Sequence, residues 1–207
     1  MSRSAALFLL GIAGMSAAAC LNLGAKPDPS RFFTLTPLAR PEPDTAGSVS
    51  HPDRVTLGLG PITLPGYLDR DQLVTRISEN RLALAENDRW GEPLEENVGR
   101  VLSQNLSRLL ADDEVTRFPW PSTDRPTYQV EIDVQRFEAD TARRARLVAR
   151  WVLSQVATGE ALVVRESRLD RSAEGPSTED SVATLSELLA DFSSEIADAV
   201  RAITRRP

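Results

Sequence analysis

The chain has 207 residues, of which 41% are hydrophobic and 26% are charged, a balance typical of globular proteins. Its net charge is -6, which argues against nucleic-acid binding, because phosphate contacts need clustered Lys and Arg side chains. A single cysteine, Cys20, excludes an intramolecular disulfide, and a single histidine, His51, leaves little scope for a zinc site or a Ser-His-Asp triad.

Residues 1–19 have the pattern of a secretory signal peptide. Arg3 provides a basic start, residues 5–13 are apolar, and small residues lead directly to Cys20. The apolar segment is too short to cross a bilayer as a helix. Two interpretations follow: cleavage before a cysteine that becomes lipidated, or an ordinary signal-peptidase site with an incidental cysteine.

The placement of Cys20 resembles the lipobox of bacterial lipoproteins, with Ala17 where a large aliphatic residue is usual. This resemblance implies that Cys20 begins the mature chain and carries a thioether-linked diacylglycerol and an N-acyl chain such as palmitate. Two or three acyl chains give a stable anchor. Position 21 is Leu21 and not aspartate, which by the same resemblance favours the outer membrane over the inner membrane. Residues 20–30 are then a lipidated tether.

The first part of the mature domain is predicted to be strands. Alternating apolar residues mark four short segments: 31–35, 54–60, 72–77 and 81–85. The first two segments are separated by a Pro-rich loop that contains His51, and loop histidines are usually solvated. In the second segment, Thr56, Gly58 and Gly60 share one face, which predicts that another element packs closely against it.

Two amphipathic helices are predicted farther along, one opening within residues 89–94 and the other following Ser177. Ser177 and Asp180 have the spacing of a capping box. Between the helices lie an edge segment, in which two prolines cannot donate ladder hydrogen bonds, and a three-stranded meander. These segments are 115–122, 128–135, 147–156 and 161–169.

The elements together predict one two-layer α+β domain over residues 31–207, with a mostly antiparallel sheet packed against two amphipathic helices. No internal repeat and no second core are visible in the sequence. The long C-terminal helix has a Ser, Glu and Asp polar face, so we expect it to cover the sheet and not to lie in a membrane.

The sequence contains no motif for catalysis, phosphate binding or metal coordination, so we expect no catalytic residues, no metal and no cofactor. The carboxylates Asp69 and Asp71 each have an arginine neighbour, as solvated ion pairs do. Arg143, Arg144 and Arg146 lie at a predicted hairpin tip, where they either meet anionic lipid head groups or form an ordinary solvated turn.

Several of these features occur in the order found in one lipoprotein family. Cys20 is followed by "RFFTL", then "LPGYLDRDQLVTR" at 64–76, then "RWGEPL" at 89–94. This arrangement resembles the PqiC/YmbA family of ABC-type transport auxiliary lipoproteins over roughly residues 32–203. The resemblance implies a non-enzymatic α+β domain at the periplasmic face of the outer membrane. It also implies partners: an MCE-domain protein and an ABC transporter or permease for lipid.

The cluster at 64–76 carries more polar groups than its Pro-Gly turn requires. An exposed tyrosine flanked by opposite charges suits a protein interface. The candidates for contact with a transport partner or with another copy of the chain are Tyr67, Asp69, Arg70, Arg76 and Trp90. The alternative is an internal Asp-Arg lock that holds the turn.

Two other functions stay open on the sequence. One is a lipid carrier that holds a lipid in an apolar groove between helix and sheet. The other is an envelope hydrolase, which would have to use His51.

Overall fold

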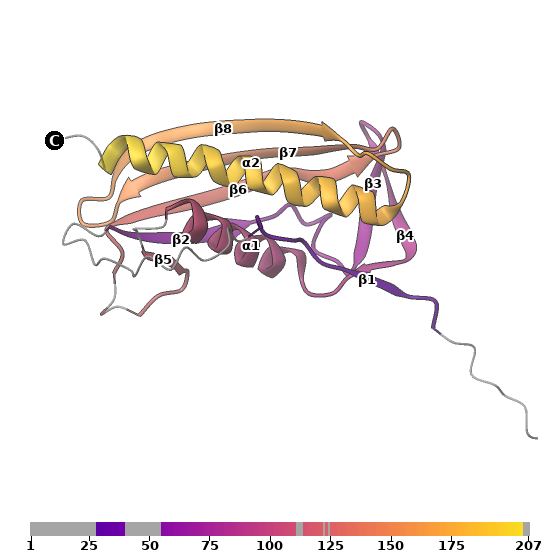
Figure 1. The fold of residues 1–207 in the computed structure, drawn as a ribbon, viewed down its shortest axis with the longest axis horizontal. Helices are drawn as coiled ribbons and strands as arrows, with labels where there is room; N and C mark the ends of the chain where they lie inside the picture. Colours follow the sequence, from indigo (N-terminus) through magenta and orange to yellow (C-terminus); the bar gives the residue numbers. More distant parts are fainter. Residues whose placement is uncertain (1–27, 40–54, 111–113, 122, 124, 205–207) are drawn as a thin grey trace, which may run out of the picture.

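The computed structural model describes residues 28–39, 55–110, 114–121, 123 and 125–204 (Figure 1). Cys20 and His51 lie outside these residues. The described chain forms one eight-stranded sheet and two helices, α1 (Leu94–Leu109) and α2 (Thr178–Thr204). The strands are β1 (Arg31–Phe33), β2 (Thr56–Thr63), β3 (Gln72–Ser78), β4 (Arg81–Trp90), β5 (Glu114–Arg117), β6 (Tyr128–Asp140), β7 (Arg144–Gln155) and β8 (Glu160–Ser172).

Strand β6 organises the sheet. Along one edge its first part pairs in parallel with β2, and its last part pairs in parallel with β3. Along the other edge it pairs antiparallel with β7, which pairs antiparallel with β8. Strands β4 and β1 continue outward from β3, and β5 flanks β2. A register shift between Val134 and Arg136 falls in the part of β6 where its neighbour changes from β2 to β3.

The structure confirms the α+β domain with two helices, but the sheet is mixed. The β3–β4 hairpin and the β6–β7–β8 meander are antiparallel, as predicted. The pairs β1–β4, β2–β5, β2–β6 and β3–β6 are parallel. Alternation of apolar residues shows which face of a strand is buried, but it carries no information on the direction of a distant partner.

The boundaries of the helices also follow local chemistry. Strand β4 extends through Trp90, so "RW" ends a strand and α1 begins only after Pro93, which occupies the N-cap position. The capping box of α2 is confirmed: Ser177 Oγ accepts from the Asp180 N–H at 3.1 Å, and Asp180 Oδ2 accepts from the Ser177 N–H at 2.8 Å.

Both helices pack on one face of the sheet and on each other (Figure 1). Alternate residues of β6 and β7 join the apolar faces of the helices in one core, in which Phe137, Trp151 and Phe192 are among the largest fully buried side chains. The intervening residues of β6, including Glu131 and Asp133, are exposed. We call this second surface of the sheet the open face, because no described helix covers it.

The segment after β1 is bound between the two helices through its backbone. The N–H groups of Leu35 and Leu38 donate to Asn97 Oδ1 (3.2 Å) and Asn105 Oδ1 (2.8 Å) of α1. The Thr36 N–H donates to Ser186 Oγ of α2 at 3.1 Å. These bonds satisfy backbone groups that pair with no strand, and they explain the buried polar residues between the helices.

Candidate functional site

The sequence cluster 64–76 includes the connection from β2 to β3. Its turn closes through hydrogen bonds from the Leu68 N–H to Pro65 O (2.8 Å) and from the Asp69 N–H to Gly66 O (3.3 Å). Leu68 is buried in the core below the turn. The connection therefore lies against β6, and the polar groups on either side of Leu68 meet that strand.

Glu138 of β6 is the centre of a buried polar network at this point. Its Oε1 accepts from Arg76 Nε at 2.6 Å and from the Arg136 guanidinium at 3.0 Å. Its Oε2 accepts from the Tyr67 hydroxyl at 2.6 Å and from the Phe137 N–H at 3.2 Å. Glu138 is only 2% exposed, so these partners replace the water that the carboxylate loses on folding.

The network shifts the ionisation of its members in opposite directions. Burial alone would raise the pKa of Glu138, but the hydrogen bonds from Tyr67 and Arg76 and the nearby positive charge outweigh it and lower the pKa below its ordinary value. Burial and the bond to Glu138 raise the pKa of Tyr67 well above its usual range. Glu138 is therefore ionised and Tyr67 neutral at physiological pH.

The structure brings the side chains of only two of the five interface candidates together. Tyr67 and Arg76 point toward Glu138, and the Arg76 guanidinium lies 5.7 Å from the Tyr67 ring centroid. Asp69 and Arg70 are exposed, and Arg70 Nε donates to Tyr67 O at 2.7 Å. Trp90 is 7% exposed and belongs to the core, so it offers little surface to a partner.

The observed lock differs from the Asp-Arg lock that the sequence suggested, because its acceptor is Glu138. Sequence reasoning missed this residue. Alternation along β6 breaks at the register shift, after which Phe137, Glu138 and Ala139 are all buried in succession. In the sequence, Glu138 stands between Phe137 and Ala139, two positions after Arg136. A glutamate between two apolar residues of a strand was the signal that could have identified it.

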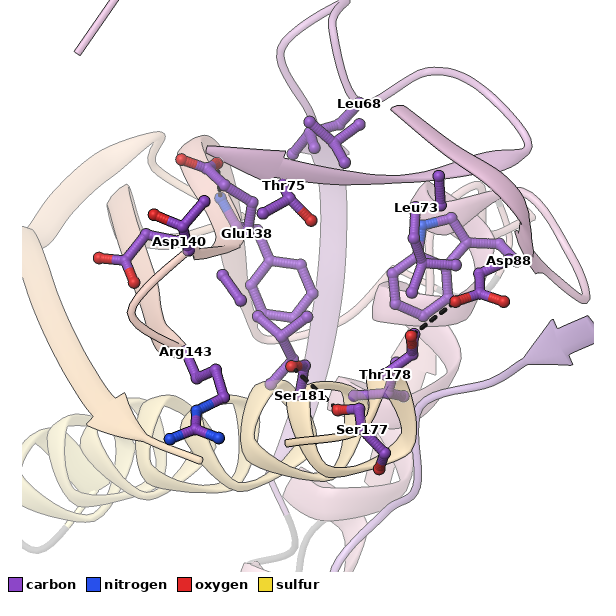
Figure 2. A pocket seen from close by; sticks show the side chains of 18 of the residues that line it. Leu68, Leu73, Thr75, Asp88, Glu138, Asp140, Arg143, Ser177, Thr178 and Ser181 are labelled. Atoms are coloured by element: carbon purple, nitrogen blue, oxygen red, sulfur yellow. Dashed lines mark hydrogen bonds between the residues drawn. The ribbon is translucent and has the colours of Figure 1, made fainter. Parts of the chain in front are cut away.

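A cavity of about 250 Å³ lies beside the network, between the sheet and the first turns of α2 (Figure 2). Its apolar wall includes Leu68, Leu73, Trp90 and Phe137. The polar side chains at its border are Asp88, Thr75, Glu138, Asp140, Thr141, Arg143, Ser177, Thr178 and Ser181. The cavity thus has the mixed lining of a small-molecule site, with polar groups both on the strands and at the start of α2.

Most polar groups of this cavity already have partners. Asp88 accepts from Arg31 at 2.7 and 2.8 Å and from Thr178 Oγ1 at 2.6 Å, and the bonds from Arg31 are the main cause of its lowered pKa. Arg143 lies in the turn between β6 and β7 with φ 61, and its N–H donates to Asp140 O at 2.9 Å. Its side chain is exposed. The hydrogen bonds from Ser177 are the main cause of the lowered pKa of Asp180, and the charge of Arg143 adds to them.

The described residues contain no group of three or more His, Cys, Asp or Glu side chains placed to hold an ion. In the same residues, no helix is both long and apolar enough to cross a membrane.

Comparison with known proteins places the chain in a family. The family model for the ABC-type transport auxiliary lipoprotein component matches residues 33–197, and the chain therefore belongs to that family. No curated protein matches the sequence significantly.

Two solved structures show the same fold. The crystal structure of an uncharacterized protein is 20% identical, with a TM-score of 0.68 over 83% of this chain and 98% of that one. A DUF330 protein from Xanthomonas campestris is 19% identical, with a TM-score of 0.64 over 84% of this chain and 96% of that one.

Proposed function

We propose that this protein is an outer-membrane-anchored periplasmic lipoprotein that acts as a non-enzymatic docking component of an MCE/ABC-type lipid transport system. The family match over residues 33–197 carries the proposal, because the family is that of a lipoprotein auxiliary to ABC-type transport. The proposed partners are an MCE-domain protein and the transporter or permease with which it works.

The proposed anchor is Cys20 with its acyl chains. Asp28, the first described residue, follows Cys20 by 28 − 20 = 8 residues, which span about 29 Å at most when fully extended. From there the chain enters β1, which Arg31 fixes to Asp88 of β4. A short tether of this kind keeps the β1 end of the domain near the membrane surface.

Two substitutions test separately whether the protein is lipidated and to which membrane it is sent. Cys20→Ala should abolish labelling with a radioactive fatty acid and move the protein from the membrane to the soluble fraction. Leu21→Asp should leave lipidation intact and shift the protein from outer-membrane to inner-membrane fractions. If Cys20→Ala stays with the membrane and supports the envelope as the wild type does, the anchoring proposal is wrong.

The docking role needs a direct binding measurement. The mature lipoprotein in detergent should bind the purified MCE-domain protein of its own transport system, and deletion of the lipoprotein should weaken the outer-membrane barrier to detergents. Absence of binding by the wild-type protein would refute the docking role.

A lipid carrier is the second candidate, because the structure has a cavity between helix and sheet. That cavity, at about 250 Å³, is smaller than the roughly 300–1,000 Å³ of typical small-ligand pockets. A two-chain lipid would therefore need the cavity to expand. Native mass spectrometry of the chain without its lipid anchor discriminates: a co-purifying lipid supports the carrier, and protein free of lipid supports the docking component.

A further inference from the structure

The open face of the sheet carries an apolar patch that the core does not use. The patch consists of Phe118, Trp120, Val152, Leu162 and Val164, none of which belongs to the core or packs against it. Phe118 is 50% exposed, Val164 is 57% exposed and Leu162 is 36% exposed. We call these five residues the open-face patch.

Strand register places the aliphatic part of the patch on one surface. Val152 of β7 pairs with Val164 of β8 on one side and with the exposed Glu131 of β6 on the other. Their chain neighbours Leu153 and Val163 pair with each other on the helix side and contact the core. Val152 and Val164 therefore lie on the open face, and Leu162 lies there with them.

The aromatic part is held on the same surface by glycine. Leu57 and Leu59 of β2 are buried toward the helices. A side chain at Gly58, which stands between them, would therefore point to the open face. A Cβ at that point would lie 2.8 Å from the Trp120 ring and 2.6 Å from Pro126. The Trp120 ring therefore covers β2 at the glycine, as the small face of this strand predicted. The Phe118 ring meets it edge-on, with the ring centroids 5.3 Å apart. Phe118 stands at the edge of the open face, because it also borders a hollow lined by Glu95 and Gly99 of α1.

The surface between the aliphatic and aromatic parts of the open-face patch contains a hollow and carries charges of both signs. A hollow of about 350 Å³ is lined by Pro61 and Thr63 of β2 and by residues of β6 and β7 that include Val152. Across the strands Asp133 faces Arg150, which faces Glu166, so the two signs alternate beside the patch. Such a surface, with exposed apolar side chains and charges of both signs, suits an apolar partner of low net charge and not a strongly charged one.

The position of the patch indicates where this partner lies. The start of β8 is level with the start of β6 and of β5, at the opposite end of the molecule from β1 (Figure 1). Val152 and Val164 lie level with Glu131, near the start of the 13-residue strand β6, whereas the tether joins the domain at the β1 end. The tether lets Asp28 lie at most about 29 Å from the membrane surface. A domain that stands on its tether with β1 toward the membrane therefore presents the patch to the periplasm.

We propose that the open-face patch is the surface that docks the MCE-domain partner, which presents an apolar surface of low net charge to it. The proposal rests on the docking role proposed above and names the surface that performs it. In that orientation the membrane lies at the β1 end, where Phe32 and Leu84 are exposed, and not at the patch.

The test compares two pairs of substitutions in the full mature lipoprotein. The double variant Phe118→Ser/Val164→Glu changes the patch, and Phe32→Ser/Leu84→Glu changes equally exposed residues at the β1 end, which are 67% and 49% exposed. Binding to the purified MCE-domain protein is measured by biolayer interferometry. We expect the patch variant to raise Kd about 30-fold or more, the effect of removing a hot spot, and the control to leave Kd within about twofold.

A photo-crosslinking amino acid at position 164, with position 84 as control, gives a second measurement in cells that does not depend on the stability of the double variant. Crosslinks to the MCE-domain protein from 164 and not from 84 support the proposal. If the patch variant binds as well as the wild type and position 164 gives no crosslinks, the patch is not the docking surface, but the docking role stands. No wild-type binding overturns both. A patch variant that changes only oligomeric state, or only binding to phospholipid vesicles, assigns the surface to a second copy or to the membrane and overturns the proposal.

Discussion

The substitution Glu138→Gln tests whether the network at the β2–β3 connection stabilises the fold. The change keeps the shape of the side chain and removes its charge. The guanidinium groups of Arg76 and Arg136 then lose their shared counterion, while Tyr67 can still donate to the amide oxygen. The effect therefore isolates the ionic part of the network.

The magnitude follows from burial. Removing one partner of a buried ion pair costs about 3–5 kcal/mol. The side chains of Arg76 and Arg136 are 17% and 30% exposed, so water can solvate part of the freed charge. We therefore expect a loss of about 2–3 kcal/mol in the free energy of unfolding, against a total of about 5–15 kcal/mol for an ordinary domain. For a domain of this size, the melting temperature should fall by about 4–12 °C.

Urea denaturation of the chain without its lipid anchor provides the assay, with the fluorescence of buried Trp90 and Trp151 as the signal. The pH dependence adds a second signature. Because the pKa of Glu138 is lower in the folded than in the unfolded protein, its contribution is present above the unfolded pKa. It is lost as pH falls through the folded value. The difference between wild type and Glu138→Gln should therefore shrink below about pH 4.

A Glu138→Gln protein within about 0.5 kcal/mol of wild type at pH 7, the usual range for a surface substitution, would refute this reasoning. Tyr67→Phe tests the same network by removing the hydrogen bond to the other carboxylate oxygen, Glu138 Oε2. It should cost about 1.5–3 kcal/mol, the range for a hydrogen bond to a charged group. Its effect should be non-additive with that of Glu138→Gln, because both act on one network.

The remaining predictions concern packing at two other places. Gly58→Val should lower the free energy of unfolding by about 1–3 kcal/mol, because the valine side chain needs the space of the Trp120 ring. Gly66→Ala should be nearly neutral, because a Cβ at Gly66 meets nothing within 4 Å. Urea midpoints compare the two variants. Asn105→Ala should cost about 1–3 kcal/mol and speed hydrogen exchange at the backbone N–H that it binds, while exposed Gln104→Ala should do neither. Equal stability within either pair would show that the contact in question contributes little.

The local elements were predictable because their causes are local. Ser177 and Asp180 cap α2 through their own side chains, and the alternation of Val130, Ile132 and Val134 marks the buried face of β6. Gly58 signalled the close approach of another element, which the structure identifies as Trp120. The end of β4 was misplaced because Trp90 packs in the core as part of a strand, a contact that its neighbours in sequence do not reveal.

The sequence by itself determined the two amphipathic helices, the hairpin and meander, and the family to which the chain belongs. The parallel pairs of β6 with β2 and β3 were decided only by the tertiary structure, because strand pairing between distant segments depends on which edges meet and not on periodicity. The same holds for Tyr67 and Arg76, which the sequence offered as surface residues. They turn inward because the fold buries the Glu138 carboxylate beside them, and a buried charge must be paired. The partner surface that we propose lies elsewhere on the open face, at the patch around Val152 and Val164.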